Sequence, residues 1–299
     1  MRKEIDKALD HLITLHNIDE NKTPNSGLGK AVGLGVFLLG AIILVSGVIG
    51  QTPISITTSS KVGNRNLPIY CVETEEPKIA LTFDAAWGNE DTKRILDILE
   101  EQQIKVTFFM TGGWVKAYPE DVKAILAAGH DLGNHSETHK NMSKLSDSEK
   151  KEEIMSVHKR VKELTGYDMI LFRPPYGDYD NALVNTADSC GYYTIQWDVD
   201  SLDWKDYGTD AIIERVCKDK HLGNGSIILC HNGAKFTADA LETMIVNLKE
   251  KGFTFVPVSE LIYRDQYHMN QEGRQIRDAG STVGENEVPE NNGVTEGIK

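Results

Sequence analysis

Between Pro77 and about Arg264, short apolar runs alternate with longer segments that repeat apolar residues at helical spacing. Short apolar runs of this kind are typical of buried strands, and the longer periodic segments are typical of amphipathic helices. The expected strands cover residues 78–83, 105–110, 131–135, 169–173, 192–197, 226–231 and 254–258. The expected helices cover 92–102, 119–129, about 146–164, 182–191, 210–219 and 238–251. Because strand and helix take turns throughout, the pattern predicts an α/β fold in which about seven parallel strands form a barrel, complete or incomplete, with helices outside.

A different pattern precedes this region. Residues Ala31 to Gly50 form a run without a charged side chain, and about twenty apolar residues are what a helix needs to cross a bilayer. A core helix of that length would normally show a polar face, and this run shows none. We therefore expect a transmembrane helix. The mixed charges before it favour an uncleaved anchor over a signal peptide, and we expect the amino-terminal side to be cytoplasmic.

These patterns divide the chain into five parts. We expect a cytoplasmic segment over 1–30, the anchor over 31–50, a linker over 51–74, the α/β domain over 75–264 and a disordered acidic tail over 265–299. The tail is rich in Gly, Asn, Glu and Gln, a composition that buries too little apolar surface to fold alone. The anchor predicts a single-pass protein of the cell membrane with its domain outside the cell.

Composition excludes one class of partner. The formal net charge is −13 at pH 7, and an acidic surface repels phosphate backbones, so we expect no nucleic acid as partner. The four cysteines, Cys71, Cys190, Cys217 and Cys230, show no CxxC spacing. Buried free thiols are the expected state; if the domain lies outside the cell, a disulfide stays open.

Polar residues gather where the predicted strands end. Asp84 follows the first strand, His135 and His139 follow the third, Arg173 ends the fourth, and His231 ends the sixth; an acidic stretch, WDVDSLDW, follows the fifth. In parallel barrels the carboxyl ends of the strands meet on one face, which is where reactive groups lie. Each residue alone is unremarkable, but together they predict one active site.

The two histidines lie four residues apart in the stretch NHSETH. Imidazole is a good ligand for zinc and similar divalent ions, and a hydrolytic site needs protein ligands on one side with an open position for water. Histidines at this spacing share one face if Ser136 to His139 begin a helix. Together with an acid and a third histidine, they predict a divalent metal ion at the site.

Five stretches, in order, resemble the polysaccharide deacetylase family, the carbohydrate esterases with the NodB homology domain, and particularly its sporulation-linked members. They are TFD (82–84), HSETH (135–139), RPPYG (173–177), DVDSLDW (198–204) and LCH (229–231). The resemblance spans roughly residues 75–263. It implies a distorted (β/α) barrel that removes N- or O-acetyl groups from sugars with a bound divalent ion such as zinc or cobalt.

The resemblance also implies a role for each matching residue. Asp84 is the expected general base, oriented by Arg173; His135 and His139 are the expected metal ligands; the backbone N–H of Tyr176 stabilises the oxyanion; His231 is the expected general acid, tuned by Asp203; and Pro175, Trp204 and Leu229 line the pocket for the acetyl group. A metal-activated water and a histidine that protonates the departing amine are consistent with these roles.

One position departs from the family. Members usually carry a second carboxylate directly after the base, as third metal ligand, and this chain has Ala85 there. A methyl group binds no metal. We therefore expect a weaker site that His135 and His139 form together with water, with Asp84, or with a side chain from the stretch 89–91 (Asn89, Glu90 and Asp91).

Two functions from different classes compete. The first is a metal-dependent hydrolase that removes N-acetyl groups from cell-wall glycan outside the cell, with peptidoglycan as leading substrate and chitin-type oligosaccharides or acetylated xylan as alternatives. The second is a catalytically silent glycan-binding or envelope assembly protein on the same fold. Ala85 favours the second, whereas the matched acid and base favour the first.

Overall fold

The main sheet is parallel throughout. The computed structural model describes residues 65–278 of the chain. Its strands are β2 (Lys78–Ala85), β3 (Thr107–Met110), β4 (Asp131–Asn134), β5 (Leu171–Phe172), β6 (Tyr193–Thr194), β7 (Val199–Asp200), β8 (Ile227–His231) and β9 (Thr254–Phe255). They lie in the order β6-β5-β4-β3-β2-β8-β7, with β9 paired to the start of β2. Within residues 65–278, β6 and β7 do not pair with each other, so the curved sheet is an open half-barrel.

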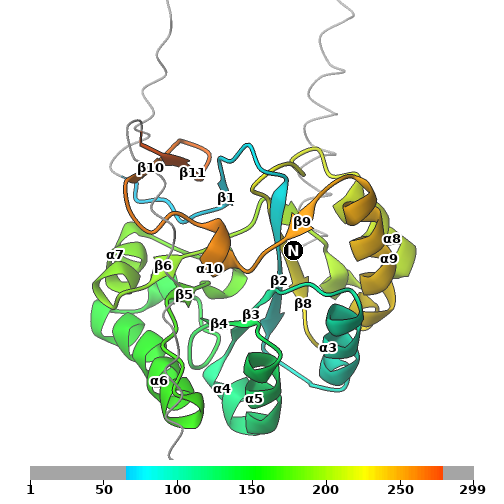
Figure 1. Ribbon diagram of the computed structural model, residues 1–299. Coiled ribbons are helices and arrows are strands. Elements are labelled where there is room, and N and C mark those ends of the chain that lie inside the picture. The colour runs from blue at the N-terminus through cyan, green and yellow to red at the C-terminus, as the bar shows by residue number, and fades with distance from the viewer. Residues whose placement is uncertain (1–64, 279–299) are drawn as a thin grey trace, which may run out of the picture. The chain divides into compact units, whose positions relative to one another are not determined.

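Helices surround the sheet (Figure 1). They are α3 (Thr92–Glu101), α4 (Gly112–Ala117), α5 (Pro119–Ala127), α6 (Asp147–Thr165), α7 (Asn181–Ser189), α8 (Thr209–Cys217), α9 (Thr237–Glu250) and α10 (Val258–Leu261). The ends of α6 show why a helix forms there. Ser146 and Glu149 make a reciprocal capping box at its start, and Gly166, with a left-handed φ of 76°, ends it.

Alternate residues of the strands fill two cores. On β2, Leu81 and Phe83 pack toward the helices, while Ala80 belongs to a second cluster on the opposite face. On β3, Phe108 and Phe109 divide in the same way, because successive side chains of a strand point to opposite faces. The central strands are therefore buried on both faces, which holds the carboxyl ends of the sheet in fixed positions.

A second, small sheet joins the two ends of the described chain. It consists of β1 (Cys71–Val72), β11 (Arg274–Arg277) and β10 (Tyr267–Met269) in that order. Figure 1 places it at the end of the domain away from α4 and α5. Gln275 on β11 is fully buried, and its side chain exchanges hydrogen bonds with the backbone of Tyr263 at 2.6 and 2.8 Å.

The predicted α/β fold of about seven parallel strands is confirmed, as a half-barrel. The predicted boundary at 264 is wrong, because β10 and β11 lie within the expected tail. The described cysteines are free, and Cys71, Cys217 and Cys230 are buried. No helix within residues 65–278 is long and apolar enough to span a membrane. The expected anchor, Ala31 to Gly50, lies outside the described residues.

Candidate active site

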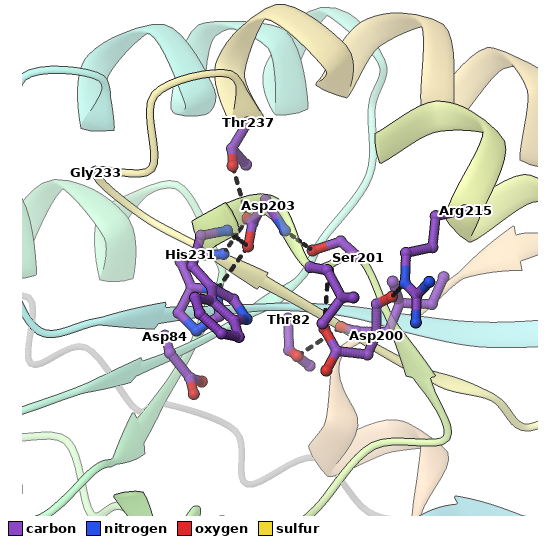
Figure 2. A network of polar contacts seen from close by, with 12 residues as sticks. Thr82, Asp84, Asp200, Ser201, Asp203, Arg215, His231, Gly233 and Thr237 are labelled. Carbon is purple, nitrogen blue, oxygen red and sulfur yellow. Dashed lines mark hydrogen bonds and ion pairs between the residues drawn. The ribbon is translucent and has the colours of Figure 1, made fainter. Parts of the chain in front are cut away.

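The predicted base and acid lie on neighbouring strands. Asp84 on β2 is the register partner of His231 on β8, so both side chains start from the same level at the carboxyl ends of the sheet. Figure 2 shows Asp84 and His231 next to each other. Residues 147 positions apart in the sequence therefore meet because parallel pairing of β2 and β8 brings their last residues together.

Arg173 forms a buried ion pair with Asp84. The Arg173 guanidinium is fully buried, lies 4.1 Å from the centre of the Phe109 ring, and donates to Asp84 Oδ1 over 2.8 Å. Burial alone would raise the pKa of the Asp84 carboxyl, but the nearby positive charge of Arg173 outweighs burial and lowers it. Asp84 is therefore an ionised carboxylate at neutral pH, as a general base requires.

His135 lies directly against this pair. Its Nδ1 is 2.8 Å from the backbone oxygen of Arg173, and its Nε2 is 3.5 Å from Asp84 Oδ2. A carbonyl accepts but cannot donate, so Nδ1 carries the proton and the lone pair of Nε2 faces Asp84. Burial lowers the pKa of His135 to about 4. The imidazole is therefore neutral, the state that binds a metal ion.

His139 lies beside His135, with 4.9 Å between the ring centres, but residues 136–139 do not begin the helix that was considered for them. Ser136 and His139 have left-handed φ values of 66° and 56°. The Asn134 side chain accepts the N–H of Ser136, and the Ser136 hydroxyl accepts the N–H of His139. Because these side chains offer the backbone an alternative to helical hydrogen bonds, the segment forms a loop that still brings both rings together.

The side chains present fit a divalent ion only as a pair of imidazoles. Within residues 65–278, no group of three or more His, Cys, Asp or Glu side chains is arranged to hold a metal ion. Ala85 is buried and offers no donor. The hydrogen bond from His135 to a carbonyl is nevertheless typical of an imidazole that binds metal through its other nitrogen. His135 and His139 are thus the candidate ligands, with Asp84 within reach.

The alternative donors of the stretch 89–91 have other partners. Asn89 donates to Asp121 over 2.6 Å, and Glu90 accepts the backbone N–H of Asn89. Asp91 accepts the backbone N–H of Gly233 at 2.9 and 3.1 Å. These contacts tie together the loops after β2 and β8, so the expectation that this stretch completes the metal site is not supported by its hydrogen bonds.

Asp203 controls His231. Asp203 is fully buried, and its Oδ1 lies 2.7 Å from His231 Nδ1. Its Oδ2 accepts hydrogen bonds from the backbone N–H of His231 and from the hydroxyl of Thr237, as Figure 2 shows. Burial opposes the charged form of His231, but the hydrogen bond and negative charge of Asp203 outweigh it, so the pKa of His231 is raised. A histidine in this state can donate a proton near neutral pH.

The turn after β5 brings Tyr176 to the same site. Tyr176 has a φ of 61° within the short 3-10 turn Pro175–Gly177, and its ring contacts the edge of His139 at 4.5 Å between centres. Pro175, at the start of this turn, is buried. The left-handed backbone gives the main chain a sharp turn. The role of its N–H in binding an oxyanion stays a prediction.

Two further predicted pocket residues differ in their surroundings. Leu229 on β8 is almost fully buried and, two residues before His231, starts from the same face of the strand. Trp204 is half-exposed, and Lys205 lies 5.0 Å from its ring centre. Both stay candidates for the pocket.

Sequence reasoning missed Thr237 and the position of Trp87. Thr237 is the first residue of α9, where a hydroxyl is too common to indicate a role. Trp87 follows Ala85 closely and stacks on His231 with 5.8 Å between ring centres. A tryptophan so soon after the base is a signal that could have been used.

Comparison with known proteins agrees with this geometry. The family model for polysaccharide deacetylases matches residues 72–195. PdaA of Bacillus subtilis, a peptidoglycan-N-acetylmuramic acid deacetylase, is 32% identical over 204 residues, covering 67% of this chain and 77% of PdaA. The chain belongs to the polysaccharide deacetylase family. The polysaccharide deacetylase predicted from the five sequence stretches is therefore confirmed. The solved structure of PdaA superimposes with a TM-score of 0.61 over 65% of this chain and 84% of PdaA, at 31% identity.

Other polysaccharide deacetylase relatives differ in what is known of them. The uncharacterised protein YlxY of Bacillus subtilis is 34% identical over 195 residues, which are 65% of this chain but 60% of YlxY, so less than two thirds of that relative is covered. Wild-type BA3943 of Bacillus anthracis, a CE4 family pseudoenzyme, is 37% identical with a TM-score of 0.62, covering 65% of this chain and 68% of BA3943. A BA3943 mutant with restored enzymatic activity is similar to the same extent. The family therefore includes members without activity.

Proposed function

We propose that this domain hydrolyses the N-acetyl groups of cell-wall glycan, with the amino sugars of peptidoglycan as its substrate. The observation that carries the proposal is the pairing of an ionised Asp84 with a His231 whose pKa Asp203 raises, on adjacent strand ends. A carboxylate base and a protonated acid at one site are what amide hydrolysis requires. The name of PdaA supports peptidoglycan as the polymer.

The chain's own residues carry out the proton transfers. Asp84, oriented by Arg173, takes a proton from the attacking water. His231, held by Asp203, gives its Nε2 proton to the departing amine. The backbone N–H of Tyr176, on the turn after β5, is the group that we assign to stabilise the oxyanion. A divalent ion such as zinc or cobalt, held by His135 and His139, would lower the pKa of its water and polarise the acetyl carbonyl.

The setting of the reaction is part of the proposal. An anchor over Ala31 to Gly50 would place the domain at the outer face of the cell membrane, next to the wall. This location is supported by the twenty residues of that segment, none of which carries a charge. Cell fractionation with protease accessibility of the intact cell tests this location; a domain that stays protected in intact cells but is cut after lysis would contradict it.

Acetate release tests the activity. The full-length chain is incubated with peptidoglycan and N-acetylglucosamine oligomers, with and without added Zn²⁺ or Co²⁺, and the muropeptides are examined by mass spectrometry. Each deacetylated sugar loses one acetyl group. We expect release by the wild type and none by Asp84→Asn, whose amide keeps the shape of the side chain but cannot take a proton. Equal release by both would contradict the assigned base.

A silent glycan-binding or envelope assembly protein is the second candidate. It is favoured by the absence of a three-ligand metal group within residues 65–278, by Ala85, and by the similarity to the BA3943 pseudoenzyme. The same assay separates the two functions. Binding of peptidoglycan without acetate release under any metal would favour the silent protein.

A further inference from the structure

Trp87 lies between the two halves of the site. Its indole is nearly parallel to the His231 imidazole, at 20° and 5.8 Å between ring centres. It meets His139 nearly edge-on, at 86° and 6.5 Å. Tyr176 also makes an edge contact with His139, at 4.5 Å between ring centres. Trp87 thus bridges the histidine on β8 and the histidine loop after β4.

The backbone around Trp87 is built to hold it there. Gly233, with a left-handed φ of 86°, lies so close that a Cβ on it would be 2.5 Å from the Trp87 carbonyl oxygen. The carbonyl of Gly88 accepts from the Trp114 indole over 2.7 Å and from Asn232 over 3.3 Å. Asp91 accepts the N–H of Gly233. The loops that carry Trp87 and His231 are therefore fixed to each other.

The exposure of Trp87 separates it from a tryptophan of the core. Trp114, which anchors the same loop, is 1% exposed, whereas Trp87 is 47% exposed. His231 stacks on the Trp87 indole and His139 meets it nearly at right angles, yet about half of the residue stays exposed. A half-exposed indole beside the proposed acid, on a loop whose backbone is fixed, presents apolar surface to the solvent at the site.

We propose that Trp87 is a positioning and specificity-determining residue: it holds the His231 ring by stacking and binds the C–H face of a pyranose ring of the glycan with its free surface. The C–H groups of a pyranose face carry small positive charge, and the face of an indole is electron-rich, so the two surfaces attract and exclude water together. This inference rests on the glycan substrate of the proposed function. It does not require that acetyl groups are released.

Binding to two probes tests the contact with the sugar. The affinity of the full-length chain for an N-acetylglucosamine tetramer and for a soluble peptidoglycan fragment is measured by calorimetry, for the wild type, Trp87→Leu and Trp87→Phe. Tyr207→Leu is the control, because Tyr207 is also exposed, at 67%, and lies on the loop before α8. Loss of one aromatic stacking contact predicts binding weakened about 2- to 12-fold in Trp87→Leu. We expect a smaller loss in Trp87→Phe and none in Tyr207→Leu.

Nuclear magnetic resonance tests the contact with His231. In the chain labelled at histidine, the ring current of a stacked indole shifts the His231 ring protons upfield. Trp87→Leu should move this signal downfield, and Trp87→Phe should restore part of the shift. If Trp87 had a purely structural role, a well-folded Trp87→Phe variant would bind the sugar with unchanged affinity.

The outcomes decide separately on the inference and on the proposed function. Unchanged binding of both probes in Trp87→Leu, equal weakening in Tyr207→Leu, or a wild type that binds neither probe would overturn the inference. If Trp87→Leu does not fold, the same comparison with Trp87→Phe decides. A protein that binds glycan through Trp87 but releases no acetate would leave this inference standing and refute the proposed activity.

Discussion

Replacing Arg173 by methionine should destabilise the domain strongly. Arg173 and Asp84 are buried together, with 0% and 6% of their side chains exposed. Methionine fills similar volume but leaves the Asp84 charge buried without its main partner. Removing one member of a buried ion pair costs about 3–5 kcal/mol of folding free energy. For a domain of roughly 200 residues, this loss corresponds to a melting temperature lower by about 6–20 °C.

Thermal unfolding of the wild type, Arg173→Met, Asp84→Asn and the double variant measures this coupling. The double variant lacks both charges of this pair, so no unpaired Asp84 carboxylate is left and it should be more stable than Arg173→Met alone. Without Arg173, burial raises the pKa of Asp84. The stability deficit of Arg173→Met should therefore shrink as the pH falls from neutral and Asp84 takes up a proton. A loss below about 1 kcal/mol, or a double variant no more stable than Arg173→Met, would refute the assigned pair.

Three further predictions test neighbouring contacts. Asp203→Asn removes the charge that raises the pKa of His231. The His231 titration, followed by magnetic resonance, should therefore move to lower pH, and so should the alkaline limb of the pH–activity profile. A titration that does not move would contradict this. His135→Ala should retain less zinc after dialysis than wild type or His268→Ala by elemental analysis, and equal content would argue against the imidazole pair. Gly233→Ala should lower the free energy of unfolding, measured in urea, by about 1–3 kcal/mol more than Gly252→Ala does. Both glycines have a left-handed φ, but only Gly233 lies against the backbone of Trp87. Equal losses in the two variants would contradict this close approach.

The sequence was sufficient for most of the sheet and for the residues at its carboxyl ends. The runs around Leu81, Phe108 and Ile228 are short and apolar on both faces, a pattern that favours a strand buried on both sides. Asp84, Arg173 and His231 could be grouped because parallel strands end at one edge. Their mutual contacts follow from register, which the alternation of apolar residues largely fixes.

Local chemistry explains where sequence reasoning failed. The histidine spacing fits a helix, but Asn134 and Ser136 bond to the backbone and produce a loop. The strands β10 and β11 have a polar composition that favours disorder. They form because β11 pairs with β1, where Val72 lies opposite Gln275. The Arg274 side chain also donates to the carbonyl of Val72, 202 residues away in the sequence. No local pattern indicates a pairing over such a separation.

The pairing of β1 with β11 limits how far the expressed chain can be truncated for crystallisation or assay. Ile69 bridges to Ile195 and Cys71 to Ser226, so an expression unit begun after Val72 would remove the segment that spans from β6 to β8. An expression unit that ends at Tyr263 would lack β10 and β11 and would expose the side chain of Val72, which is now fully buried, to solvent. Soluble versions of this protein should keep at least residues 69–277 in one piece.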